Sequence, residues 1–289
     1  MKRAHRNLLA ALAGFFILAY SGIVGLLAVS ENSMVYASAG EGKRGRTVPG
    51  DDAGIPWDTL RVRAADSVPV FLLRSVVDAA PTRLWAIFFH GNAGMVGSRG
   101  NVARYQLLRD AGFNVLAVEY RGYGASVGAG PASEDGIYED ARAALAYLTD
   151  SLGVERSRVV AYGWSLGSGP ATRLAAEAPL AALVTEGAFT SLPDVGAESY
   201  PWAPVRLVMR NRFDNVGLAR RLTMPWLVLH GTKDREIPFA HGEALVAAAS
   251  AARLVPLDAD HGDGAIGDRA VALEALRSLA ARISAPSRE

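Results

Sequence analysis

The chain contains no cysteine, which excludes a thiolate nucleophile, a disulfide framework and any cysteine-bound metal site. It also lacks an excess of either charge, because 30 Lys and Arg residues face 29 Asp and Glu residues. No long basic stripe with interleaved aromatic residues is present, so nucleic acid is not an expected partner. Histidine is scarce, and neither a His-x-x-x-His pair nor a Gly-Lys-Ser/Thr phosphate loop occurs, so we expect no metal and no nucleotide cofactor.

The first clear feature is an apolar run that carries no charge from Leu8 to Val29 and follows the basic segment MKRAHR. At about 1.5 Å per residue the run reaches roughly 33 Å, enough to cross a hydrocarbon core of about 30 Å. Because basic flanks stay in the cytoplasm, the run predicts a single-pass anchor with the catalytic domain on the non-cytoplasmic side, periplasmic or lumenal and extracellular. A cleaved signal peptide is the alternative, since Ala37-x-Ala39 resembles a cleavage site, but its apolar core is usually only about 7–15 residues long.

The remainder divides into a Gly-, Ser- and charge-rich linker over residues 31–56 and a regular region over residues 57–289. Residues 1–30 form the anchor or signal segment. Two strands joined by a turn at residues 65–69 open the regular region, and six apolar runs then alternate with helix-like segments. The six strands are expected at residues 84–89, 114–120, 158–163, 181–187, 226–231 and 253–258. The helices between and after them are expected at residues 101–112, 133–153, 165–178, 240–252 and 268–283. This alternation predicts an α/β fold with a mostly parallel sheet covered on both faces.

A serine stands between two glycines in YGWSLGSG, directly after an expected strand and before an expected helix. A sharp turn from strand to helix needs residues without side chains on both sides, and Gly163 and Gly167 supply them. The free N–H groups of the helix start favour a negative oxygen that develops beside the serine. The pattern therefore predicts Ser165 as a nucleophile, with an idle serine in a glycine-rich turn as the alternative.

A serine nucleophile needs a base, most often a histidine that a carboxylate orients. His261 follows the last strand in a loop of turn-forming residues and is the best candidate, because His90 and His230 precede glycines where a histidine braces a loop. His241 lies inside an expected helix, where a surface position is the simpler interpretation. Asp234 follows the preceding strand and is the expected carboxylate.

The loop FFHGNAG after the first long parallel strand offers the second half of an oxyanion hole. Gly91 and Gly94 let the backbone bend close to a substrate, so the N–H of Asn92 is expected to point inward beside the N–H of Leu166.

With these parts assembled, the sequence from about Trp57 onward resembles the α/β-hydrolase superfamily. The segments FFHGNAG, VEYRGYGAS, YGWSLGSG and HGTKDREIP are similar to those of small, N-terminally anchored serine hydrolases of the bud-emergence and depalmitoylating ABHD type. The resemblance implies an eight-stranded, mostly parallel sheet with helices on both faces and a minimal lid. Two departures stand at Glu119, where the group usually has Asp, and at Gly262, where Asn often follows the catalytic histidine.

In that group the matching positions make Ser165 the nucleophile, Asp234 the acid and His261 the base. The implied reaction is two-step hydrolysis of carboxylic esters or thioesters on small-molecule, lipid-like or acylated substrates near a membrane. Residues 190–224 are long enough for a lid of two short helices. Two alternatives remain open: an aminopeptidase-type hydrolase in which Glu186 holds the substrate amine, and a catalytically idle, membrane-anchored interaction protein.

Overall fold

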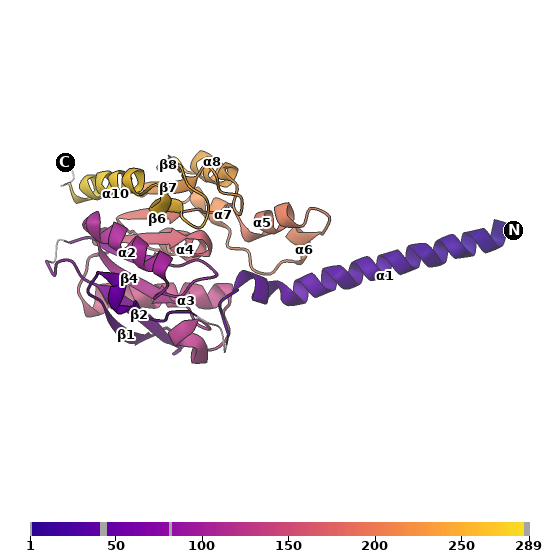
Figure 1. The fold of residues 1–289 in the computed structure, drawn as a ribbon, viewed down its shortest axis with the longest axis horizontal. Helices are drawn as coiled ribbons and strands as arrows, with labels where there is room; N and C mark the ends of the chain where they lie inside the picture. The colour runs from indigo at the N-terminus through magenta and orange to yellow at the C-terminus, as the bar shows by residue number, and fades with distance from the viewer. Residues whose placement is uncertain (1, 41–44, 81–82, 286–289) are drawn as a thin grey trace.

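One eight-stranded sheet organises the regular part of the chain in a computed structural model that describes residues 2–40, 45–80 and 83–285 (Figure 1). The strands are β1 (Asp58–Arg63), β2 (Pro69–Ser75), β3 (Trp85–Phe89), β4 (Asn114–Glu119), β5 (Val159–Trp164), β6 (Ala182–Glu186), β7 (Trp226–Gly231) and β8 (Ala252–Leu257). Their order in the sheet is β1-β2-β4-β3-β5-β6-β7-β8, and only the β1–β2 and β2–β4 pairs are antiparallel. The mostly parallel eight-stranded sheet predicted from the sequence is confirmed.

The strands form where the sequence carries continuous apolar runs. Every residue of β3 and β4 is buried, as expected for strands covered on both faces. Strand β8 lies at the edge of the sheet, and its burial instead alternates along the strand. Buried residues gather in two clusters, one on each face, that include Ile137, Leu174 and Leu245 on one side and Leu108 and Leu276 on the other.

Helices cover both faces of the sheet. They are α2 (Arg99–Asp110), α3 (Glu134–Ala146), α4 (Ser168–Glu177), α8 (Phe239–Ala248), the single turn α9 (Gly264–Gly267) and α10 (Arg269–Ser284). Helices α3, α4 and α8 contribute to the first cluster, and α2 and α10 contribute to the second. The helix expected over residues 133–153 ends earlier than predicted, because a π-helical turn at Tyr147–Ser151 follows α3.

The lid differs in detail from the expectation of two short helices. It contains three, α5 (Leu192–Ser199), α6 (Val205–Val208) and α7 (Asn215–Ala219). Helix α5 begins with Ser191, whose hydroxyl accepts the N–H of Asp194 at 3.2 Å, so this start has a local N-cap. Sequence periodicity in such short segments is too weak to count the helices.

Helix α1 (Lys2–Val35) projects away from the domain as one continuous rod (Figure 1). Among the residues that the structure describes, it is the helix long and apolar enough to cross a membrane, and the most apolar part of it is not buried. The helix extends past the expected anchor boundary at residue 30 and continues through Val35 before the chain turns into the domain. Tyr36 is buried there, so the linker has a residue docked on the domain near its start.

Candidate active site

Ser165 lies at a sharp turn between β5 and α4. Its φ of +52° lies in the left-handed region that side chains disfavour, which is the strained geometry of a nucleophile on a strand-to-helix turn. The flanking glycines make the turn possible: a Cβ on Gly163 would overlap the carbonyl of Gly167, and a Cβ on Gly167 would overlap the carbonyl of Phe89. Ser165 is only partly buried, so its hydroxyl can meet a ligand.

His261 joins the serine to an aspartate. Its Nε2 lies 2.9 Å from the Oγ of Ser165, and its Nδ1 lies 2.7 Å from Oδ2 of Asp234. The three residues are brought together from loops that follow β5, β7 and β8, which end at the same edge of the sheet. The structure therefore places the predicted nucleophile, base and acid in one hydrogen-bonded line.

The carboxylate of Asp234 is fixed from both sides. Its Oδ1 accepts the backbone N–H groups of Glu236 at 3.0 Å and Ile237 at 2.8 Å, while Oδ2 faces His261. Burial would raise the pKa of Asp234, but the hydrogen bonds from His261 and Ile237 outweigh burial and lower it. The group is therefore ionised at neutral pH and aimed at the imidazole.

The pKa of His261 moves in the opposite direction. Burial disfavours the charged imidazolium, but the hydrogen bond and the negative charge of Asp234 exceed that effect and raise the pKa above 6.5. A histidine with this environment accepts a proton more readily than a free imidazole. The arrangement is suited to taking the proton of Ser165.

The loop after β3 passes close to the serine. Phe89 pairs with Gly163 in the sheet, and a Cβ on Gly91 would lie 3.5 Å from the Cβ of Ser165. The carbonyl of Gly91, which shares a peptide with the N–H of Asn92, lies 2.8 Å from Nδ1 of His90, and the carbonyl of Asn92 accepts the N–H of Ser38 at 3.1 Å. Leu166 follows the serine in the 3-10 turn that precedes α4. The two expected oxyanion donors thus belong to segments that lie beside the nucleophile.

Glu186 is not available to hold a substrate amine, which removes the basis of the aminopeptidase alternative. Its carboxylate is 1% exposed and pairs with Arg104, whose Nη2 lies 2.6 Å from Oε1 and whose Nε lies 2.9 Å from Oε2. The carboxylate also accepts hydrogen bonds from the hydroxyl of Tyr162 at 2.5 Å and from the N–H of Ala265 at 2.8 Å. Burial would raise the pKa of Glu186, but the charge of Arg104 outweighs burial and lowers it.

Arg104 is a residue that the sequence did not single out. Its Nη2 donates to the carbonyl of Gly262 at 3.1 Å, directly after His261, and its guanidinium lies 3.9 Å from the ring centroid of Trp164, directly before Ser165. The buried Arg104–Glu186 pair therefore touches the chain next to two of the three predicted site residues. No local pattern could reveal it, because the partners are 82 residues apart.

The remaining histidines of the domain brace loops. His90 Nδ1 lies 2.8 Å from the carbonyl of Gly91, and His230 Nε2 lies 2.9 Å from the carbonyl of Ile237. The surface position expected for His241 is wrong, because its side chain is buried and its Nδ1 accepts the N–H of Thr190 at 3.1 Å. It thereby ties α8 to the base of the lid.

Arg121 of the YRGYG segment has a structural role. It donates to both oxygens of Asp140 on α3, from its backbone N–H at 2.8 Å and from Nε at 3.0 Å. Its Nη1 lies 2.6 Å from Asp66 in the β1–β2 turn. The residue ties a helix and the hairpin together, away from the line of Ser165 and His261.

Comparisons with known proteins agree with this architecture. The family model for the alpha/beta hydrolase fold matches residues 87–216. An uncharacterized protein of Mycobacterium tuberculosis is 37% identical over 190 residues, which cover 65% of this chain and 66% of the relative. Protein bem46 of Schizosaccharomyces pombe is 30% identical over 247 residues, which cover 78% of this chain and 79% of bem46. The solved structure of the Pyrococcus furiosus esterase Pf2001 is 17% identical and has a TM-score of 0.68. The match covers 84% of this chain and 100% of the esterase chain.

Proposed function

Because this chain belongs to the α/β-hydrolase family, we propose that it is a serine hydrolase that cleaves carboxylic ester or thioester bonds through an acyl-enzyme. The observation that carries the proposal is the hydrogen-bonded line from Asp234 through His261 to the Oγ of Ser165, at 2.7 Å and 2.9 Å. The strained backbone of Ser165 supports the same role, because such strain is characteristic of functional positions.

In the first step His261 takes the proton of Ser165 as Oγ attacks the carbonyl carbon of the substrate. The imidazolium that forms is stabilised by the carboxylate of Asp234, and it then gives its proton to the leaving alcohol or thiol. In the second step water attacks the acyl carbon while His261 removes its proton. The bond between the acyl carbon and Oγ then breaks, His261 returns the proton to Ser165, and the acyl group leaves as a carboxylic acid. No metal or cofactor is needed for either step.

The negative oxygen of each tetrahedral intermediate needs hydrogen-bond donors. The backbone N–H groups of Leu166 and Asn92 are the proposed donors, since both belong to segments beside Ser165. The carbonyl of Gly91 shares a peptide with the N–H of Asn92 and lies 2.8 Å from Nδ1 of His90, which supports a fixed orientation of that N–H.

The proposed substrates are lipid-like or acylated molecules at a membrane surface. Helix α1 supports membrane anchoring by its length and exposed apolar surface, and the basic residues at its N-terminal end support a non-cytoplasmic catalytic domain. Small soluble esters would then be model substrates and not the natural ones.

The test uses a fluorophosphonate, which reacts with an activated serine. The full-length protein is expected to be labelled and to release acid from acyl esters and thioesters of graded chain length, whereas Ser165→Ala should show neither reaction. Ser151→Ala, which removes an exposed serine, is the control and should keep both reactions.

Folding must be verified by circular dichroism for each variant. A folded wild-type protein that does not react with the probe would contradict the proposed chemistry. A strict preference for aminoacyl amides over esters and thioesters would contradict the substrate class while leaving the nucleophile in place.

A further inference from the structure

The last turns of α1 are fastened to the lid through Glu31, which is only 5% exposed. Its Oε1 accepts the backbone N–H of Arg210 at 3.0 Å, and the backbone and side-chain N–H groups of Asn211 at 2.7 Å and 2.6 Å. The hydroxyl of Tyr36 donates to Oδ1 of the same asparagine at 2.5 Å. The direction of α1 relative to the lid is therefore fixed by buried hydrogen bonds.

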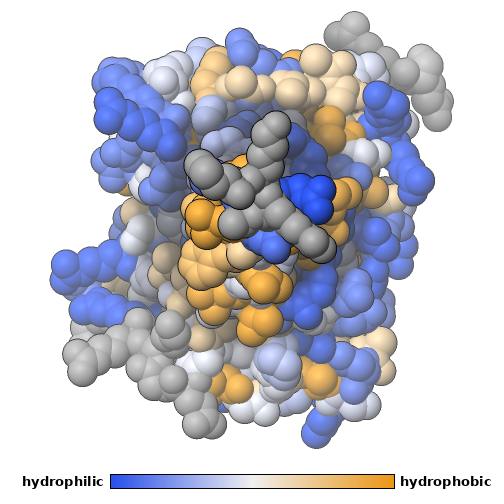
Figure 2. Space-filling view, turned by 90° about the vertical axis from the view of Figure 1, so that its right-hand side faces the viewer, coloured by the Kyte–Doolittle hydropathy of each residue, from blue (hydrophilic) through white to orange (hydrophobic). Residues whose placement is uncertain are grey.

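A second contact lies further toward the N-terminus of α1. The hydroxyl of Tyr20 donates to the carbonyl of Trp202 at 3.0 Å, and the two rings meet edge to face with centroids 6.3 Å apart. Trp202 is 50% exposed and Leu207 of α6 is 87% exposed. Seen along α1, apolar residues gather around the helix in the middle of this face (Figure 2). The turn between α5 and α6 thus presents large apolar side chains beside the candidate membrane span.

The length of α1 decides how deep this turn lies. If Tyr20 marked the membrane surface, the uncharged stretch from Leu8 to Tyr20 would cross only about 20 Å. A hydrocarbon core is about 30 Å thick, which corresponds to about 20 helical residues. A membrane-spanning stretch that starts at Leu8 must therefore continue about seven residues past Tyr20, to about Leu27. The contact with Tyr20 then puts Trp202 roughly 10 Å below the membrane surface.

Two arginines of the same lid segment are paired, Arg206 within the lid and Arg210 with the last turns of α1. Arg206 pairs with Asp194 at 3.0 Å, and Arg210 donates from Nη2 to the carbonyl of Ala28 at 3.1 Å while its Nε lies 3.5 Å from Glu31. Long arginine side chains can hold their charge near the headgroups while the neighbouring apolar residues enter the core. The charges of the lid are thus compatible with an inserted turn.

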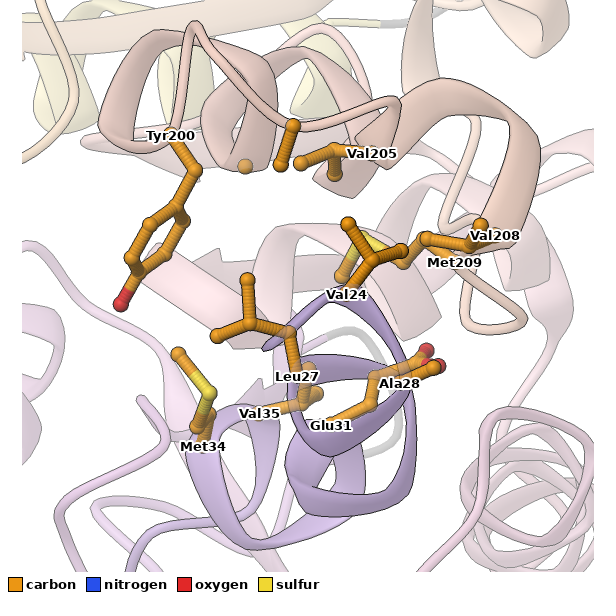
Figure 3. Close-up of a pocket in the computed structure, with 12 residues that line it drawn as sticks. Val24, Leu27, Ala28, Glu31, Met34, Val35, Tyr200, Val205, Val208 and Met209 are labelled. Carbon is orange, nitrogen blue, oxygen red and sulfur yellow. The ribbon is translucent and has the colours of Figure 1, made fainter. Parts of the chain in front are cut away.

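An apolar groove separates α1 from the lid helices. Figure 3 shows Val24 and Leu27 of α1 facing Tyr200 and Val205 of the lid across it, with Met209 beside them. The cavity volume of the groove is about 90 Å³, which admits a short stretch of an acyl chain. Neither the nucleophile nor its two partners line it, so it is distinct from the catalytic line.

We propose that the α5–α6 turn is inserted into the bilayer beside α1, and that the groove between them holds an acyl chain of a lipid in the same leaflet. An acyl chain is the fitting occupant because one wall of the groove is the candidate membrane span itself. The facing wall, formed by the lid, is also mainly apolar. The inference rests on the proposed membrane anchoring and does not depend on the proposed catalytic chemistry.

The depth of the turn can be measured on the full chain, which has no cysteine of its own. Leu207→Cys, Phe16→Cys and Leu152→Cys each place one nitroxide label, and the protein is reconstituted in palmitoyl-oleoyl phosphatidylcholine vesicles. Collisions with oxygen, which concentrates in hydrocarbon, are compared with collisions with a water-soluble nickel chelate. Phe16 is an exposed residue of α1, and Leu152, 40% exposed, is the control on the domain.

The labels at positions 207 and 16 are expected to favour oxygen several-fold, and the label at position 152 should favour the nickel chelate. If the label at position 207 behaves like the label at position 152, while the label at position 16 lies in hydrocarbon, the insertion of the α5–α6 turn is contradicted and the membrane anchor is not. If the label at 16 also favours the chelate, the anchoring itself is wrong and the inference falls with it.

The occupant of the groove is tested with a phosphatidylcholine that carries a diazirine at the end of one acyl chain. Light-induced labelling of Val205 and Met209, mapped by mass spectrometry, is expected in the wild type and should fall several-fold in Val24→Trp, which fills the groove. Ile23→Trp adds the same ring to a neighbouring exposed position and should leave the labelling unchanged. Equal labelling in both variants would show that the groove holds no acyl chain.

Discussion

The buried pair of Arg104 and Glu186 yields a prediction that reaches both stability and catalysis. Both side chains are 1% exposed, so solvent cannot reach the carboxylate in place of its partner. Removing one member of such a pair leaves an uncompensated buried charge, which costs about 3–5 kcal/mol. Glu186→Gln keeps the shape of the side chain and removes only its charge, so its effect measures the electrostatic contribution.

Thermal unfolding of the full-length protein in detergent micelles, followed by circular dichroism, is the assay. For a domain of this size each kcal/mol shifts the midpoint by about 2–4 °C, so Glu186→Gln should lower it by roughly 6–20 °C. The control is the exposed pair of Lys233 and Asp258, whose side chains are 65% and 74% exposed. Asp258→Asn should cost less than about 1 kcal/mol.

The double variant Arg104→Met, Glu186→Met separates charge from packing. A buried ion pair can often be replaced by apolar residues at little cost, so the double variant should unfold at a higher temperature than either single variant. Because Arg104 contacts Gly262 and Trp164 beside the site, every variant of the pair should also lower kcat more than it raises KM. A midpoint for Glu186→Gln no lower than that of the Asp258→Asn control would refute the reasoning.

Three further predictions follow from the site and from α1. Ser165→Gly should be inactive yet about 1 kcal/mol more stable than the equally inactive Ser165→Ala in urea unfolding, because glycine tolerates φ +52°; equal stability would contradict the strain. The midpoint of the acidic limb of kcat/KM should lie above pH 6.5, because His261 must be neutral to act as base and its pKa is raised. Asp234→Asn should move this midpoint to lower pH and reduce kcat by about 10⁴-fold. The protein isolated from membranes should keep α1, because a cut after Ala39 would remove Glu31 from its buried partners; an N-terminus at residue 40 in intact-mass measurements would contradict this.

The edge of the sheet that carries the candidate site was predictable because its signals are local. Each parallel strand is a short apolar run, and each candidate residue follows such a run within a few positions. Parallel strands end at a common edge, so Ser165, Asp234 and His261 could be placed together without knowledge of the strand order. The glycines beside the serine added a steric requirement that the structure meets.

Contacts between distant polar residues were not predictable. Glu31 and Asn211 are 180 residues apart, and nothing in the Gly- and Ser-rich surroundings of Glu31 marks it as buried. The carboxylate of Glu186 has the sequence context of an exposed strand end, yet it lies against Arg104. His241 was misplaced for the same reason, because its burial depends on the lid folding over α8 and not on its own helix.

A short segment of the lid connects the end of α1 to α4, the helix that follows Ser165. Asn211 holds the end of α1, and Phe213 two residues later is fully buried, at a positive φ of 37°, with its ring filling the space beside Gly169 of α4. Asn215 then donates to the hydroxyl of Ser168 at 3.1 Å, three residues after the nucleophile. A bulky residue keeps such a backbone only when its surroundings over-determine it, so this segment is rigid. Helix α1, the base of the lid and the turn at Ser165 therefore form one rigid unit. Under the proposed anchoring, the distance between the bilayer and Ser165 is then set by the fold and not by a flexible linker.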